Sequence, residues 1–121
     1  MRRQVLFVQG GGQGAHDEWD NRLVDGLAQV LGQDHEIRYP RMPDEADPAY
    51  PPWKQALEME FAGLKDGAVL VGHSIGAAIL VNAVAADPPH CELGGIFLVA
   101  APFIGDGGWP SDGIESREAR G

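Results

Sequence analysis

The chain of 121 residues is poor in cysteine and in basic side chains. Its single cysteine, Cys91, excludes an intrachain disulfide and a zinc site made of several thiolates, and it is typical of a reducing compartment. We therefore expect a cytoplasmic protein with no metal and no cofactor. Lys and Arg number 9 and Asp and Glu 18, so the net charge is −9. Because such a chain repels phosphates and anionic lipids, we expect neither nucleic acid nor a membrane as partner.

Long hydrophobic segments are also scarce. The apolar run near the N-terminus, residues 5–8, is too short for a secretory signal. The most apolar window, residues 69–86, is long enough to raise the question of a membrane span. It contains Gly72, His73, Ser74 and Gly76, which indicate a turn in its middle. A buried strand, a tight turn and a buried helix therefore explain this window better than a span does.

Strands and helices alternate along the predicted chain. Strands are predicted at residues 5–8, 35–39, 69–71 and 96–99, and helices at residues 17–31, 52–65 and 75–86. This alternation predicts the α/β class, as a three-layer sandwich with a mostly parallel sheet and helices on both faces. The first helix would turn one apolar face to the core, made of Trp19, Leu23, Leu27, Val30 and Leu31.

The strongest local signal is the sequence Gly72-His73-Ser74-Ile75-Gly76. It follows the third predicted strand and opens the third helix, which is the context of the G-x-S-x-G nucleophile elbow. A sharp turn there would lift Ser74 above the carboxyl edge of the sheet, and its crowding favours glycine at both flanking positions. The helix behind it would direct free N–H groups at the site. The alternative interpretation is an ordinary turn.

A glycine loop, residues 9–14, follows the first strand and predicts an oxyanion hole. We expect the N–H groups of Gly11 and Ile75 as donors, with Gly12 as the second choice in the loop. The same loop also matches a permissive dinucleotide fingerprint through Gly10, Gly12 and Ala15. The acidic start of the next helix would repel a pyrophosphate, so nucleotide binding is the weaker hypothesis.

The sequence supplies no obvious base for a serine nucleophile. The chain has four histidines, at positions 16, 35, 73 and 90, and none lies where a triad base is expected. Asp106 and Asp112 follow the last strand, and no histidine follows them. Asp106 could act as the triad acid, but it would have no base to orient. We therefore expect an impaired enzyme, and the alternative is a non-catalytic α/β module that binds a protein or a ligand.

Taken together, these motifs resemble the α/β-hydrolase superfamily, and more narrowly the small serine hydrolases of the retinoblastoma-binding-protein-nine and YdeN group. The resemblance covers about residues 4 to 110, and its matching stretches are residues 7–12, the Trp19 region, and residues 39–44, 52–53, 69–76 and 96–102. It implies Ser74 as nucleophile, with an acid after a fifth strand and a histidine after a sixth. Since this sequence has neither, we expect a C-terminally truncated hydrolase fold, with a partial domain at residues 1–110 and an irregular tail at residues 111–121.

The resemblance also implies a reaction and a topology. Ser74 would form an acyl-enzyme with a small ester or amide and then be freed by water. The four strands would lie in the order second, first, third, fourth, so that the glycine loop and Ser74 meet at the switch point of the sheet. The fourth strand would be an exposed apolar edge, and such edges favour self-association.

Overall fold

A four-stranded parallel sheet forms the centre of the protein. The computed structural model describes residues 2–99. The strands are β1 (Arg3–Val8), β2 (His35–Arg38), β3 (Val69–His73) and β4 (Gly95–Val99), in the order β2-β1-β3-β4. All neighbouring pairs are parallel. The predicted α/β class and strand order are thus confirmed, whereas the expected domain end at residue 110 and the tail beyond it lie outside the described residues.

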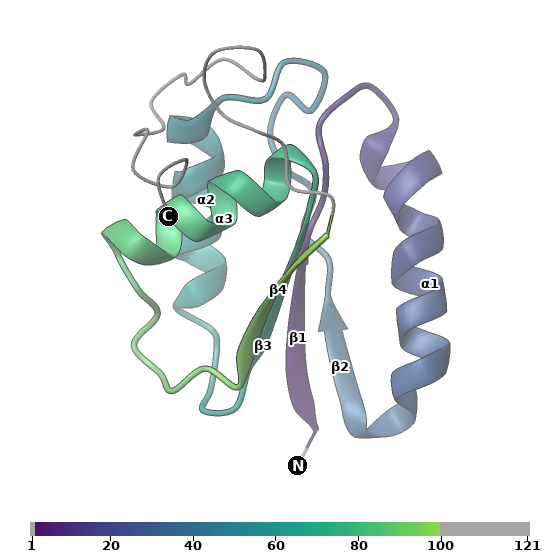
Figure 1. Cartoon of the computed structure of the whole chain (residues 1–121), viewed down its shortest axis with the longest axis vertical. Helices are drawn as coiled ribbons and strands as arrows, with labels where there is room; N and C mark the ends of the chain where they lie inside the picture. Colours follow the sequence, from purple (N-terminus) through teal and green to yellow (C-terminus); the bar gives the residue numbers. More distant parts are fainter. Residues whose placement is uncertain (1, 100–121) are drawn as a thin grey trace.

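Helices cover the two faces of the sheet (Figure 1). Helix α1 (Asp20–Leu31) lies on one side, and helices α2 (Tyr50–Phe61) and α3 (Ile75–Ala86) lie on the other. A single π-helical turn, η1 (Ala15–Trp19), leads into α1, and a 3₁₀ turn, η2 (Gly32–Asp34), leads out of it. The elements therefore form the three layers that the alternating pattern predicts.

The main core lies between the sheet and the pair α2 and α3. Helix α2 turns one apolar face to this core, since Trp53, Leu57 and Phe61 are at most 5% exposed. Helix α3 is buried along most of its length, as its apolar composition predicts. Helix α2 begins at Tyr50, carries its prolines in the first turn, and ends at Phe61 rather than at the predicted residue 65.

The apolar face predicted for α1 is wrong in part. Trp19 is 62% exposed, Leu23 44% and Val30 83%. Each of these three residues lies one position before a residue that faces inward, so its side chain points around the helix axis toward solvent. The side chains that turn inward are spaced five, four, three and four apart: Ala15, Asp20, Val24, Leu27 and Leu31.

An apolar groove separates α1 from β4 on this face of the sheet. Its volume is about 520 Å³, and Leu27 and Leu31 form one wall while Val69, Val71 and Phe97 form the other. Beside it, the four apolar side chains of residues 96–99 are 39% to 59% exposed. Within residues 2–99, β4 is therefore an apolar edge strand with both faces open to solvent.

The apolar window at residues 69–86 folds as β3 and α3, with Ser74 between them. This confirms a strand, a turn and a helix in place of one continuous segment. Of the helices in the described part of the chain, none has the length and apolar character needed to cross a membrane.

Two glycines allow the tight turn between β3 and α3. A Cβ at Gly72 would lie 2.7 Å from the Cα of Ala77, and a Cβ at Gly76 would collide with the carbonyl oxygen of Gln9. The first glycine lets α3 begin directly against β3, and the second lets α3 contact the end of β1. The spacing of the two glycines is therefore set by backbone packing on either side of Ser74.

We predict that Gly76→Ala destabilises the protein by about 1–3 kcal/mol, because β1 and α3 must separate to admit the methyl group. Gly26→Ala is the matched control, since Gly26 also lies inside a helix but has no atom within 4 Å of its added Cβ. That change should stabilise the protein by about 0.5–1 kcal/mol through helix propensity alone. Urea denaturation measures both, and equal effects would contradict the packing argument.

Candidate active site

Ser74 occupies an unusual backbone conformation at the carboxyl edge of the sheet. Its φ is 58° and its ψ is −131°, and it joins β3 directly to α3. Such a conformation is costly for a residue with a Cβ and persists where the surroundings hold it. The Ser74 N–H donates to the carbonyl of Val99 at 2.9 Å, so the end of β4 supports the turn. The side chain is half-buried at the N-terminus of α3.

The glycine loop lies against this turn. A Cβ at Gly10 would be 3.3 Å from the Cβ of Ser74, and a Cβ at Gly11 would be 2.9 Å from the Cγ2 of Ile75. The structure therefore brings together three of the residues that the sequence singles out: Gly11, Ser74 and Ile75. Pro48 closes the loop from the other side, because the same Cβ at Gly11 would lie 2.7 Å from its Cγ.

Most backbone donors of the glycine loop are already used. The Gly10 N–H donates to Asp20 Oδ2 at 2.5 Å, the Gly12 N–H to the Glu45 carbonyl at 2.6 Å, and the Gly14 N–H to Glu45 Oε2 at 2.7 Å. Within residues 2–99, the N–H groups of Gly11 and Ile75 donate to no other group. Gly12, the second choice from the sequence, is therefore not free to act as a donor.

A buried amide and a carboxylate hold the loop in place. The side chain of Gln9 is fully buried, and its Oε1 accepts the Met42 N–H at 2.7 Å. Its Nε2 donates to Glu45 Oε1 at 2.9 Å, and the His16 N–H donates to the same oxygen at 3.1 Å. The hydrogen bonds that Gln9, His16 and Gly14 donate to Glu45 lower the pKa of this carboxyl below its usual value. They join the glycine loop to the segment at residues 41–48.

His16 packs on Tyr39 and has no free ring nitrogen. Its ring stacks on Tyr39 with centroids 3.9 Å apart. Its Nδ1 lies 2.8 Å from Asp17 Oδ1 and its Nε2 lies 3.1 Å from the Tyr39 carbonyl. The Tyr39 hydroxyl donates to the His16 carbonyl at 2.5 Å, and burial together with nearby carboxylates raises the pKa of this phenol well above its usual range. Tyr39 therefore stays protonated, and His16 is not available as a base.

His73 contacts a buried acid that the sequence analysis did not single out for the site. Its Nδ1 lies 3.0 Å from Oδ1 of Asp20, a side chain only 2% exposed. The alignment is too poor for a hydrogen bond, and this Nδ1 has no other partner among the described groups. The contact is an ion pair only when the imidazole is protonated, and it involves the residue directly before Ser74.

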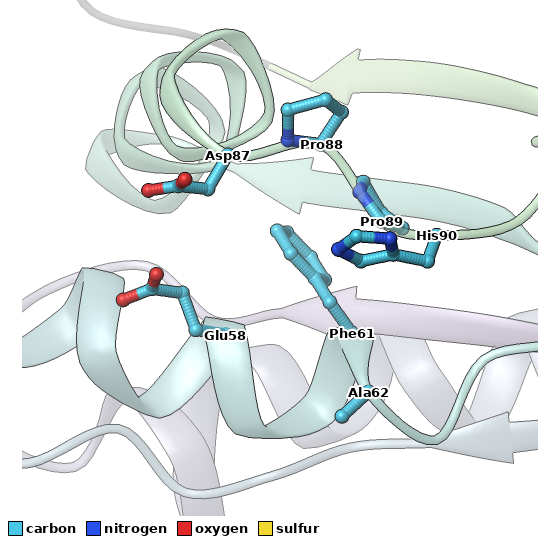
Figure 2. A pocket seen from close by; sticks show the side chains of 7 residues that line it. All are labelled: Glu58, Phe61, Ala62, Asp87, Pro88, Pro89 and His90. Carbon is cyan, nitrogen blue, oxygen red and sulfur yellow. The ribbon is translucent and has the colours of Figure 1, made fainter.

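The two remaining histidines lie far from Ser74. His35 begins β2, at the opposite edge of the sheet, and its Nδ1 contacts the Leu31 carbonyl at 3.2 Å. His90 lines a small pocket of about 180 Å³ beyond the C-terminal end of α3. Figure 2 shows Phe61 reaching from α2 toward His90, with the carboxylates of Glu58 and Asp87 at the other end. Since α3 is about 18 Å long, His90 cannot reach Ser74.

The described residues offer no metal site, and the glycine loop is poorly suited to a dinucleotide. No three His, Cys, Asp or Glu side chains within residues 2–99 converge on a position for a metal ion. The N–H groups of Gly10 and Gly14, which a pyrophosphate would need, donate to carboxylates of the protein itself. Asp106 and Asp112 lie outside the described residues.

Sequence reasoning missed Asp20 and Glu45 as parts of this site. Asp20 could have been found, because it continues the inward stripe of Val24, Leu27 and Leu31 at helical spacing, and an acid on such a stripe must have a partner. Glu45 carries no comparable signal. It lies in an irregular segment, and only the folded loop shows that it accepts three donors.

We predict that Glu45→Gln destabilises the protein by about 1 kcal/mol at neutral pH, because an amide cannot accept all three donors. The folded-state pKa of Glu45 is lowered, so its contribution is complete above the ordinary glutamate pKa and is lost as pH falls through the lowered value. The stability difference between the two proteins should therefore shrink in acid. Urea denaturation across pH tests this, with Glu36→Gln, an exposed change on β2, as control. A difference that does not vary with pH would contradict it.

Comparison with known families gives one match. The family model described as Serine hydrolase matches residues 5–112, which includes the glycine loop, the turn at Ser74 and all but the first residues of the sheet. Comparisons with curated proteins and with solved structures found no significant match. A match over most of the chain, on a parallel α/β sheet with Ser74 at its carboxyl edge, settles the family: the chain belongs to the serine hydrolases.

Proposed function

We propose that Ser74 is the nucleophile of an acyl-transfer reaction on small carboxylic esters, with thioesters and small amides as related substrates. The observation that carries the proposal is the conformation of Ser74, held at φ 58° beside the N–H groups of Gly11 and Ile75, which have no acceptor among residues 2–99. Strained serines at a helix N-terminus are typical of nucleophile elbows. Within the serine hydrolases, the motifs favour the small retinoblastoma-binding-protein-nine and YdeN group.

The proposed reaction has two steps. The Ser74 oxygen attacks the acyl carbon while its proton passes to solvent water, and the carbonyl oxygen becomes an oxyanion that accepts from Gly11 and Ile75. The carbonyl re-forms, and the alcohol departs with a proton. Water then attacks the acyl-serine in the same geometry and releases the acid. The N-terminus of α3 favours the negative charge in both steps.

Proton removal is the weak part of this site. All four histidines of the sequence are described, and none presents a free ring nitrogen that the contacts direct at Ser74: His16 is fully engaged, His35 and His90 are distant, and His73 directs its Nδ1 at Asp20. We therefore propose that this chain hydrolyses esters slowly. Loss of the triad base removes several orders of magnitude in rate and leaves the oxyanion contribution. The single cysteine favours a cytoplasmic location.

We predict that an alkyl fluorophosphonate labels Ser74 slowly but stoichiometrically, because the probe places a phosphoryl oxygen where the oxyanion would form. Intact-mass spectrometry measures the rate, and peptide mapping locates the adduct. Ser74→Ala should abolish labelling while leaving the melting temperature nearly unchanged.

Labelling that persists at another residue in Ser74→Ala would contradict the proposed nucleophile. A folded protein that takes no label at any probe concentration would favour the alternative function, a non-catalytic α/β module that binds a ligand through the same crevice.

We also propose that the chain self-associates through β4. Its side chains are apolar on both faces of the sheet, and within residues 2–99 it has a neighbour on one side only. The opposite edge, β2, is shorter and carries charged residues, which discourage pairing. A copy of β4 would match the first in length and would pair with its open backbone edge, which brings the apolar side chains of the two strands side by side.

We predict that the protein forms a dimer or larger oligomer whose population rises with concentration, measured by size-exclusion chromatography with light scattering. Phe97→Lys should shift it toward monomer, because a charge on an edge strand opposes pairing. Val30→Lys is the control, since Val30 is 83% exposed but lies on α1, away from the edge. A cooperative monomer at every concentration would refute self-association.

A further inference from the structure

Asp20 is the one acidic side chain buried within residues 2–99, at 2% exposure. This chain has 18 acidic residues. Acidic side chains usually lie at the protein surface, where water solvates their charge. A carboxylate taken out of water needs partners that replace its hydration. The contacts of the two carboxylate oxygens therefore indicate the structural role of Asp20.

The two oxygens of Asp20 contact the glycine loop and the turn that carries Ser74. Oδ2 accepts the Gly10 N–H at 2.5 Å, in the glycine loop. Oδ1 lies 3.0 Å from Nδ1 of His73, the residue before Ser74. One carboxylate from α1 thus links the loop that would supply an oxyanion donor to the turn that carries the nucleophile.

The packing around this link leaves little freedom. A Cβ at Gly10 would lie 3.0 Å from Nδ1 of His73 and 3.3 Å from the Cβ of Ser74. The loop therefore fits closely against the turn, and a shift of the Gly10 backbone toward Ser74 would produce a clash. A shift away would break a short charge-assisted hydrogen bond, which is stronger than a neutral one.

The hydrogen bond from Gly10 to Asp20 also affects which N–H group of the glycine loop is left to bind a ligand. Asp20 takes the donor of Gly10, and the backbone and side chain of Glu45 take those of Gly12 and Gly14. Among the loop glycines, Gly11 alone is left without an acceptor in the described part of the chain. The peptide that carries the Gly11 N–H is held on its other side, where the Gly10 carbonyl accepts Gln9 Nε2 at 3.1 Å. Without the carboxylate of Asp20, the peptide before Gly10 could rotate, and Gln9 alone would hold the orientation of the Gly11 N–H.

We infer that Asp20 is a positioning residue, whose carboxylate holds the glycine loop so that the Gly11 N–H points at the acyl oxygen of a substrate bound at Ser74. It acts through Gly10 and touches no substrate. This inference rests on the proposed function of Ser74. It requires a hydrogen-bond acceptor at the place of Oδ2, and it does not require the negative charge itself.

The test compares Asp20→Asn with Asp20→Ala. Asparagine can present its amide oxygen to the Gly10 N–H without the charge, whereas alanine presents no acceptor. For each variant, the alkyl fluorophosphonate reaction is separated into the maximal inactivation rate and the half-saturating probe concentration. Hydrogen exchange with mass spectrometry follows the peptides that contain residues 9–14. Asp25→Ala is the matched control, an exposed acid on the same helix.

Positioning predicts that Asp20→Ala lowers the maximal inactivation rate about tenfold or more, with the half-saturating concentration within about twofold of wild type. Asp20→Asn should restore most of the rate. The loop amides should exchange faster in Asp20→Ala than in Asp20→Asn or in the control.

Equal slowing of the inactivation rate in both variants would show that the charge of Asp20 matters rather than the position of its oxygen, and would overturn the inference. Wild-type rates and exchange in Asp20→Ala would overturn it as well.

Two further outcomes remain decisive. If the wild-type protein takes no label, the proposed function fails, and the exchange of the loop amides alone decides whether Asp20 orders the loop. If Asp20→Ala does not fold, Asp20→Glu replaces it, because the extra methylene keeps the charge but moves the oxygens. Slow labelling and fast loop exchange in Asp20→Glu would then support positioning, and wild-type behaviour would refute it.

Discussion

The contact between the end of β1 and the start of α3 is the constraint on which the site depends. Gly76 packs so closely on the carbonyl of Gln9 that no side chain fits between them. This approach places the glycine loop, which begins at Gln9, beside the turn that begins at Gly72. Backbone packing therefore sets the position of the glycine loop beside Ser74. The surrounding side chains refine a geometry that the two backbones already set.

Carboxylates fix the glycine loop from within. A loop rich in glycine loses much conformational entropy when it becomes ordered, so specific bonds must offset that cost. Asp20 and Glu45 provide them by accepting N–H groups of Gly10, Gly14 and His16. Both acids lie near the place where an oxyanion would form, which would oppose its charge. Because each carboxylate is turned toward N–H donors, its field at the Gly11 N–H is reduced.

The sequence was sufficient to predict the elements whose apolar residues are buried in a regular pattern. The positions of α2 and of the strand and helix around Ser74 follow from periodicity and alternation, and the order of the strands follows from the resemblance to the α/β-hydrolases. Sequence reasoning failed for part of α1, because the hydrophobic pattern does not show that Asp20, and not Trp19, faces inward with Val24. It also failed for the acids that organise the loop, since bonds between a side chain and a distant backbone N–H have no fixed spacing along the chain.

The edge strand β4 of the described sheet and the turn at Ser74 are physically connected. The Ser74 N–H donates to the carbonyl of Val99, the last residue of β4, and His73 pairs with Val99 in the sheet. An edge strand that is open on one side frays more readily than a central strand. Fraying at Val99 would release the N–H of Ser74 and relax the strained φ that lifts its side chain above the sheet. A partner that covered β4 would therefore also stabilise the conformation of Ser74. The proposed association at this edge should then increase the proposed reactivity of Ser74.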